Sequence, residues 1–310
     1  MFISVIVPHY NHAPYIKQRM DSILQQTYAE FEIILLDDAS TDGSREILLS
    51  YAQHPKVSHC LINEVNSGST FSQWKKGITL AKGELIWIAE SDDISDPEFL
   101  SCLQNRLSAA PQVQMSVCNL ITINEESQTL SRRTYYPNKI WNSKNLLIHE
   151  FTRGNYIWNV SSVLFRRTAF DAVRWKQIEN MRFCGDWLFY VQIIEQAQCL
   201  TVSEVLNQFR IHPQTVSKHP QSAYWSFSEG LIAVQHILQL YSISPLQRIL
   251  ICKHWLEKIR ESNFDAETTV KVISLIQQTF GTQIVNASRR GFWCWHFLSK
   301  LQQGMRARLK

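Results

Sequence analysis

Three carboxylates within four positions, Glu90, Asp92 and Asp93, mark the segment of this 310-residue chain with the clearest chemical potential. They directly follow an unbroken apolar run, residues 85–89, which is typical of a strand buried on both faces of a sheet. In open α/β sheets, ligands bind just beyond the carboxyl ends of the strands. Because charges this close repel one another, the cluster either is solvated and caps a helix or holds a divalent cation. The segment alone leaves both interpretations open.

Polar residues also follow three other apolar runs, which we predict to be strands at residues 2–8, 31–36 and 57–62. Helical periodicity separates these runs, and strands alternating with helices through short links predict a parallel sheet with right-handed crossovers. Because parallel strands end at the same edge of a sheet, we expect the polar residues to meet Glu90 and its neighbours there. Taken singly, each can be an ordinary turn or capping residue. The residues are Pro8, Tyr10, Asn11, Asp38, Ser40, Asn66 and Gly68.

Two later segments carry groups able to do chemistry. Asp186 lies at the predicted start of a helix, where a carboxylate is either a catalytic base or a cap that gains about 0.3–1 kcal/mol from the helix dipole. We expect it to be the base, since Gly185 lets the backbone approach a ligand closely, and Glu179 and Glu195 are the alternatives. His212 follows a predicted strand, where a histidine is either a hydrogen-bonded structural residue or a metal ligand.

The region between these segments carries weaker signals. We expect a helix near 97–107 and strands near 113–121 and 158–165, with Trp158 as a core residue rather than a platform for a sugar ring. The polar stretch 124–138 is either a mobile loop over an acceptor or an ordinary surface excursion, and we favour the second.

Composition limits the kind of protein. The chain is 45% hydrophobic with few glycines and prolines, which indicates one large or two smaller folded domains. No apolar run approaches the ~20 residues that a membrane-spanning helix needs, and residues 1–8 resemble a first strand rather than a signal peptide. Seven scattered cysteines without a C-x-x-C pair indicate a reducing compartment and no zinc site. We therefore expect a cytoplasmic protein.

The net charge of +4 is unevenly distributed. From Thr268 to the end there are seven basic and no acidic residues, whereas the rest carries 24 basic and 27 acidic residues, so a uniformly basic nucleic-acid binder is excluded. After residue 220 only helical patterns occur, at 224–238, 245–260 and 266–280. The end, 289–310, mixes cations with aromatic residues and is either a packed terminal helix or a peripheral contact with the inner face of the cell membrane.

Four motifs together resemble, in order and spacing, the family 2 inverting glycosyltransferases of the GT-A fold. The resemblance covers about the first 100 residues, with weaker marks to about residue 218. The motifs are Val5-Ile6-Val7-Pro8-His9-Tyr10-Asn11, Leu36-Asp37-Asp38-Ala39-Ser40-Thr41-Asp42-Gly43-Ser44, Asn66-Ser67-Gly68 and Glu90-Ser91-Asp92-Asp93.

The resemblance implies a Rossmann-like α/β fold, with a mostly parallel sheet flanked by helices. It implies a GT-A domain at 1–220, divided into a nucleotide-sugar half at 1–95 and an acceptor half at 96–220, before a helical C-terminal region at 221–310. The implied reaction is metal-dependent, inverting transfer of a sugar from a nucleoside-diphosphate sugar, most often UDP, to a hydroxyl of a glycan or lipid-linked acceptor. Such enzymes commonly build cell-surface polysaccharides.

Roles at the donor follow from the same resemblance. Pro8, Tyr10 and Asp38 are expected to line the base and ribose, with Asp38 on the base. The wider set expected to bind the donor adds Asn11, Ser40, Asn66, Gly68, Lys75, Glu90, Asp92 and Arg210.

Roles at the metal and the acceptor are implied in the same way. Asp92 and Asp93 occupy the acidic D-x-D place near the diphosphate, with Asp93 on Mn²⁺ or Mg²⁺. Arg210 and His212 resemble a loop that folds over the diphosphate, and in some members this histidine completes the metal shell. Asp186 corresponds to the catalytic base.

The chain departs from the family pattern at three places. Glu90 stands where many members have Asp, and Gly185 replaces the first residue of a Glu-Asp pair. Residues 73–76 read Gln-Trp-Lys-Lys in place of an Arg-Asn pair, so Lys75 or Lys76 either substitutes for the arginine or is solvated.

Two other functions compete with glycosyl transfer. A nucleotidyltransferase also uses acidic metal ligands, but it usually cradles a triphosphate with a Gly- and Lys/Arg-rich loop where this chain has residues 9–12, His-Tyr-Asn-His. A non-catalytic nucleotide-sugar-binding module would keep the pocket without turnover.

Overall fold

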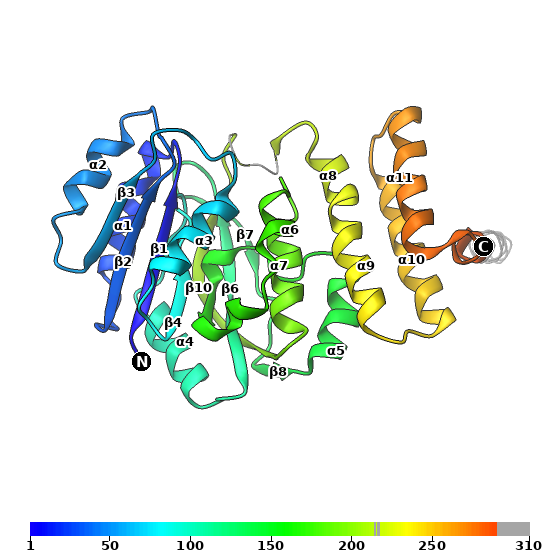
Figure 1. The fold of residues 1–310 in the computed structure, drawn as a ribbon, viewed down its shortest axis with the longest axis horizontal. Helices are drawn as coiled ribbons and strands as arrows, with labels where there is room; N and C mark the ends of the chain where they lie inside the picture. The colour runs from blue at the N-terminus through cyan, green and yellow to red at the C-terminus, as the bar shows by residue number, and fades with distance from the viewer. Residues whose placement is uncertain (214, 216–217, 290–310) are drawn as a thin grey trace, which may run out of the picture.

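The computed structural model describes residues 1–213, 215 and 218–289 (Figure 1). It contains one ten-stranded sheet, with the strand order β3-β2-β1-β4-β9-β6-β10-β5 and with β7 and β8 paired to β6 and β10. The strands are β1 (Ile3–His9), β2 (Phe31–Asp37), β3 (Val57–Ile62), β4 (Leu85–Ile88), β5 (Ile94–Ser95), β6 (Val113–Ile123), β7 (Thr129–Arg133), β8 (Lys139–Trp141), β9 (Val163–Arg166) and β10 (Gln198–Arg210). The basic aromatic segment expected to touch a membrane lies, from residue 290 on, outside the described residues.

Strands β1 to β4 are parallel, as the alternation of apolar runs and helical patterns predicts. Their register sets His9 beside Asp37 and Asp37 beside Ile62, so the loops after these strands leave the sheet at one edge. Beyond β4 the sheet becomes mixed, since β9 runs antiparallel to both β4 and β6. The expectation of an α/β fold is confirmed, and the sheet is mixed, with its parallel part in β1 to β4 and in the pair of β6 and β10.

Helices cover both faces of the sheet. Side chains of β1 alternate, with Val5 in the core under one set of helices and Ile6 in the core under the other. One set comprises α1 (Ala13–Leu24), α2 (Ser44–Tyr51) and α4 (Phe99–Ser108), and the other α3 (Thr70–Leu80), α6 (Trp175–Glu179) and α7 (Gly185–Ile194).

A stack of helices extends the molecule beyond α7, away from β1 to β3 (Figure 1). The stack is joined to the sheet domain by core contacts, such as the stacked rings of Trp187 and Trp255, 6.0 Å apart. The stack confirms the helical C-terminal region. The single helix expected at 224–238 is, however, interrupted at Glu229. The carboxylate of this residue accepts hydrogen bonds from the backbone N–H groups just before α7. The helices are α8 (Ser222–Ser228), α9 (Gly230–Leu240), α10 (Pro245–Glu261) and α11 (Ala266–Phe280).

The structure adds detail to one expectation for the middle of the chain and corrects another. The polar stretch 124–138 contains β7, which forms a hairpin with β6, so it is a surface excursion with regular structure. The strand expected at 158–165 begins only at Val163, after a 3₁₀ turn, η2 (Val160–Ser162). At this turn the Ser161 hydroxyl accepts a hydrogen bond from the backbone N–H of Glu90, at 3.0 Å. The other short helices are α5 (Ser143–Leu146), η1 (Leu147–Phe151) and η3 (Arg167–Ala172).

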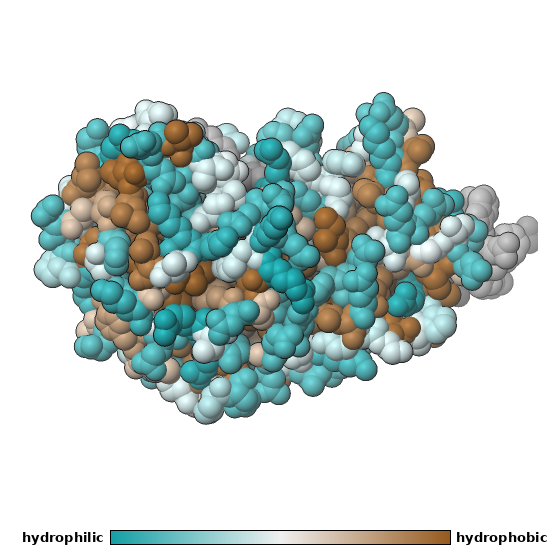
Figure 2. Space-filling view, in the orientation of Figure 1, coloured by the Kyte–Doolittle hydropathy of each residue, from teal (hydrophilic) through white to brown (hydrophobic). Residues whose placement is uncertain are grey.

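The face of the molecule seen in Figure 2 is largely hydrophilic, with apolar side chains in separate areas over the N-terminal part and around α10 and α11. Exposed apolar residues on these two helices include Leu246, Leu250 and Val270. Among the described residues, no helix combines the length and the apolar character that crossing a membrane requires.

Candidate active site

A cavity of about 960 Å³ opens at the carboxyl ends of β1, β2 and β4 and continues to the start of α7. It thus joins the carboxylate segment after β4 to Asp186, although these groups are far apart in the sequence. The predicted site residues that line it are Pro8, Tyr10, Asn11, Asp38, Asn66, Gly68, Glu90, Asp92, Asp186 and His212. The predicted residues that do not line it are Ser40, Lys75, Asp93 and Arg210.

Asp38 organises the loop that follows β3. Its Oδ1 accepts hydrogen bonds from Asn63 Nδ2 (2.6 Å), from the Ser67 backbone (2.9 Å) and from Gln73 Nε2 (2.9 Å). Its Oδ2 accepts only from the Ser67 hydroxyl, at 2.7 Å, among the described residues. A carboxylate oxygen accepts about two hydrogen bonds, so Oδ2 keeps capacity for a ligand N–H at the wall of the cavity.

Asn11 and Ser40 tie the loops after β1 and β2 together. Asn11 has a φ of 53°, its backbone donates to Ser40 Oγ at 3.0 Å, and its Oδ1 accepts from the Thr41 backbone at 2.8 Å. Buried Ser40 therefore positions the loop that carries Tyr10, a residue that is 44% exposed and lines the cavity.

Asn66 and Gly68 shape the third loop of this edge. Asn66 Nδ2 donates to the carbonyl of Asp38 at 2.9 Å, and its Oδ1 accepts from the Gly68 backbone at 2.7 Å. Gly68 has a φ of +72°, a conformation that side-chain-bearing residues rarely adopt. Both residues hold the backbone of the cavity wall in place.

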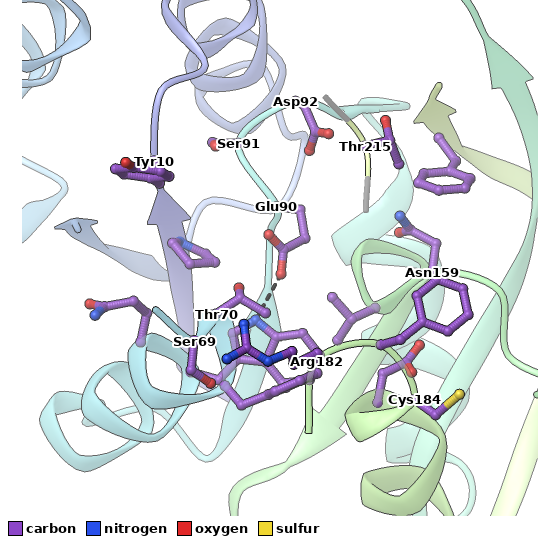
Figure 3. A pocket seen from close by; sticks show the side chains of 18 of the residues that line it. Tyr10, Ser69, Thr70, Glu90, Ser91, Asp92, Asn159, Arg182, Cys184 and Thr215 are labelled. Atoms are coloured by element: carbon purple, nitrogen blue, oxygen red, sulfur yellow. Dashed lines mark hydrogen bonds between the residues drawn. The ribbon is translucent and has the colours of Figure 1, made fainter. Parts of the chain in front are cut away.

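The segment after β4 presents Glu90 and Asp92 to the cavity, where Figure 3 shows them between Tyr10 and Thr215. Glu90 Oε1 accepts a hydrogen bond from Trp74 Nε1 at 2.7 Å. Burial, with the neighbouring charge of Asp92, raises the pKa of Glu90 to about 8. Trp74 thus orients the residue that departs from the family's usual Asp.

Asp93 and Arg210 are turned away from the cavity into the protein. Asp93 accepts from the Arg210 backbone (Oδ1, 3.0 Å) and from Asn159 Nδ2 (Oδ2, 2.9 Å), and burial raises its pKa to about 6. The fully buried Arg210 guanidinium donates to the Asp92 carbonyl at 2.8 Å and to Gln18 Oε1 at 2.7 Å. The geometry therefore favours Asp92 over Asp93 as the carboxylate that a cation in the cavity would contact.

Three metal-ligating side chains, from His12, Asp92 and His212, converge at one end of the cavity. One ligand atom from each lies within 4.8 Å of the others, and His212 Nε2 is 3.1 Å from Asp92 Oδ2. Burial opposes the ionisation of Asp92, but the two imidazoles outweigh it and lower the pKa of this carboxyl. Adjacent ligands about 2.1 Å from an octahedral ion are about 3 Å apart, so this donor set fits a divalent cation.

The lysines of α3 do not reach the cavity. Lys75 Nζ pairs with Glu179 at 3.1 Å, and Lys76 Nζ donates to Asn63 Oδ1 at 2.6 Å. Cations come instead from Arg182, which Figure 3 shows pointing into the cavity, and from Lys258 of α10.

Asp186 is the second residue of α7. Its Oδ2 accepts from Asn155 Nδ2 at 2.8 Å and its Oδ1 from the Trp187 backbone at 2.7 Å, so it is held rigidly. Burial raises the pKa of Asp186 to about 7, which suits a group that takes a proton near neutrality. Glu179 and Glu195, the alternatives, are not among the residues lining the cavity; Glu195 pairs with Arg174 at 3.0 Å.

The model of one protein family, glycosyl transferase family 2, matches residues 4–173, more than half of the chain. The chain belongs to this family. Its relatives include an uncharacterized glycosyltransferase of Bacillus subtilis, EpsJ, 28% identical over 226 residues, which are 70% of this chain and 63% of that protein. A putative teichuronic acid biosynthesis glycosyltransferase of the same species, TuaG, is 37% identical over 29% of this chain and 36% of its own length. The matches thus span less than two thirds of these relatives.

Solved structures show the fold of this family 2 member. The structure of Staphylococcus aureus TarS, residues 1–349, in complex with UDP-GlcNAc matches with a TM-score of 0.71 at 16% identity, covering 92% of this chain and 83% of that one. The GT-A fold is therefore confirmed.

The motifs of the family did not reveal every residue at the cavity. Four residues that line the cavity were not predicted from the motifs: His12, Asn155, Arg182 and Lys258. The only sequence feature that could have indicated His12 is its closeness to His9 in the run His-Tyr-Asn-His at residues 9–12. Trp158, expected in the core, is 43% exposed at the cavity and has the Arg133 guanidinium 4.2 Å from its ring centroid.

Gly185 serves packing rather than ligand approach in this family 2 member. A Cβ at this position would lie 2.4 Å from Cε2 of Phe71, so the glycine lets the start of α7 lie against α3. We expect Gly185→Ala to lower the free energy of unfolding by about 1–3 kcal/mol through overpacking. Urea denaturation measures this, with Gly154→Ala as the control because a Cβ there meets nothing within 4 Å. Equal stability of the two variants would contradict the packing role.

Proposed function

We propose that the protein is a metal-dependent inverting glycosyltransferase that uses a nucleoside-diphosphate sugar, most often UDP-linked. The observation that carries the proposal is the single cavity that joins the loops after β1, β2 and β4 to a rigidly held carboxylate at the start of α7. The first part suits a nucleotide diphosphate with a cation, and the second suits activation of an acceptor hydroxyl.

The donor occupies the sheet edge. Tyr10 and Asp38 contact the base and ribose, for which the free capacity of Asp38 Oδ2 and the exposed Tyr10 ring provide the surface. Asp92 and His212 would hold Mn²⁺ or Mg²⁺, and such an ion would neutralise the charge that develops on the leaving diphosphate. The choice of UDP is supported by TarS, which shares the fold and was crystallised with UDP-GlcNAc.

Asp186 acts as the base in a single displacement. Its carboxylate takes the proton of the acceptor hydroxyl as that oxygen attacks the anomeric carbon, and the bond from this carbon to the diphosphate oxygen breaks on the opposite face. Hydrogen bonds from Asn155 and the Trp187 backbone keep the carboxylate aimed into the cavity.

The acceptor is a glycan or lipid-linked glycan of cell-surface polysaccharide synthesis. Trp158 offers an exposed aromatic surface beside Asn159 and Asn155 at the acceptor side of the cavity, and such surfaces stack on sugar rings. The similarity to TuaG, a putative teichuronic acid biosynthesis glycosyltransferase, supports this class of product.

A thermal-shift panel of nucleotide sugars, nucleoside diphosphates and triphosphates, with and without Mn²⁺, tests the proposal. We expect one nucleotide sugar together with Mn²⁺ to stabilise the protein more than the sugar or Mn²⁺ alone. At a hundredfold excess over its dissociation constant, a ligand stabilises the protein by about 2.7 kcal/mol relative to the free protein. Release of the nucleoside diphosphate from that sugar in a product assay should follow. Preference for a triphosphate would indicate a nucleotidyltransferase, and binding without release or transfer would indicate a binding module.

A further inference from the structure

We propose that His12 is a third protein ligand of the cation, so that the site is assembled before the donor arrives. The inference rests on the proposed cation at Asp92 and His212 and adds a residue that the family motifs do not assign a role. The cation would then bind the nucleotide-free protein and would not have to arrive together with the nucleotide.

The three ligands come from separate parts of the fold. His12 precedes α1, Asp92 follows β4 and His212 follows β10, and their ligand atoms gather within 4.8 Å. The rings of His12 and His212 meet edge to face with centroids 5.2 Å apart. Convergence of two imidazoles on one carboxylate from three segments is the geometry of a site rather than of a local turn.

Neighbouring groups orient the imidazole of His12 and pack against that of His212. His12 Nδ1 lies 2.9 Å from the hydroxyl of Ser91, which is 1% exposed. When Nδ1–H donates to this hydroxyl, Nε2 keeps its lone pair, as in metal-ligating histidines held by an outer partner. The backbone of His212 donates to Thr215 Oγ1 at 3.0 Å, and Tyr15 packs on the ring of His212 at 5.1 Å.

The donor set determines which cation is held. Two imidazole nitrogens and one carboxylate oxygen suit Mn²⁺ and later transition ions, whereas Mg²⁺ prefers oxygen ligands in a strict octahedron. We therefore expect Mn²⁺ to bind the nucleotide-free protein and Mg²⁺ to bind it far more weakly.

Titration of the full, nucleotide-free chain with Mn²⁺, followed by the electron paramagnetic resonance signal of free Mn²⁺, tests this inference. We expect one bound ion per chain, with nitrogen hyperfine coupling from two imidazoles in electron spin-echo spectra. Loss of an outer partner of a metal ligand costs about 10–100-fold in affinity, so Ser91→Ala should weaken binding by about that factor and His12→Ala by at least as much. Each single variant, His12→Ala or His212→Ala, should leave coupling from one imidazole.

His149→Ala is the matched control, because it removes an exposed imidazole from η1 and should leave Mn²⁺ affinity unchanged. Wild-type affinity in His12→Ala, or coupling from a single imidazole in the wild type, would overturn the role of His12. Absence of Mn²⁺ binding without nucleotide would overturn preassembly. Any of these three results would leave the glycosyltransferase proposal standing if Mn²⁺ still stabilises the donor complex.

Discussion

Asp186→Asn should lower the turnover number by about 10²–10⁴-fold while donor affinity stays unchanged. Asparagine keeps the shape of the side chain and can still accept the hydrogen bond of the Trp187 backbone through Oδ1, although its Nδ2 then faces the donor Nδ2 of Asn155. It cannot take the proton of an acceptor hydroxyl. Steady-state transfer kinetics at saturating donor measure the loss, and donor binding is measured separately. As a cap alone, asparagine would be nearly equivalent to aspartate, so the substitution separates the two roles.

The pH dependence of the wild-type enzyme should report the same carboxylate. A base works only when deprotonated, and burial raises the pKa of Asp186 to about 7, so turnover should fall about tenfold per pH unit below 7 and level off above it. Stability should respond in the opposite sense. The folded pKa exceeds the unfolded value of about 3.9, so the stability that the protonated carboxyl provides is fully present below pH 4, is lost as the pH rises from about 4 to about 7, and changes no further above that. The melting temperature of Asp186→Asn should therefore lack the decline between about pH 4 and about pH 7 that this carboxyl causes in the wild type.

Glu179→Gln provides the control, because Glu179 does not line the cavity and pairs with Lys75. Its turnover and pH profile should match the wild type. More than about a tenth of wild-type turnover in Asp186→Asn would show that another group is the base.

Asp92→Asn should weaken Mn²⁺-dependent donor binding by about tenfold or more, with little change in melting temperature. A bound metal contributes several kcal/mol to charge stabilisation, and each 1.4 kcal/mol corresponds to about tenfold. Asp92 faces the cavity beside His12 and His212, so its loss removes a ligand without opening the core. Calorimetric titration with nucleotide sugar, with and without Mn²⁺, measures the effect.

Asp93→Asn is the informative companion to this variant. Asp93 accepts from Asn159 Nδ2 and the Arg210 backbone inside the protein, so an amide there brings two donors together and should cost about 1–3 kcal/mol of stability. Mn²⁺ affinity of the folded variant should be largely retained. If Asp93→Asn loses Mn²⁺ while Asp92→Asn keeps it, the metal role belongs to Asp93, as the family resemblance implies.

The strands and helices of the nucleotide-sugar half could be predicted from the sequence because short stretches of chain, through their apolar pattern, largely decide them. The apolar runs of β1, β2 and β4 and the periodicity of α3 depend on residues close in the chain, and the parallel order follows from short links. The motif residues after these strands met at one edge for the same reason. A departure arose at Val160–Ser162, a 3₁₀ turn in a run predicted as strand, where the Ser161 hydroxyl accepts from the backbone N–H of Glu90, 71 positions away in the chain.

The residues alone determined the family, the α/β fold and the edge of the sheet that carries the site. The direction of each side chain at that edge was decided only in three dimensions. Asp92 and Asp93 are adjacent and chemically alike, yet Arg210, 117 positions after Asp93, holds Asp93 inside while Asp92 faces the cavity. Lys75 forms an ion pair with Glu179 and does not line the cavity. The cationic residues that line it are Arg182 and Lys258, and no nearby motif indicates either of them. The direction of a side chain depends on hydrogen bonds and packing between segments that are far apart in the sequence. Such contacts produce no periodic pattern in the sequence from which they could be predicted.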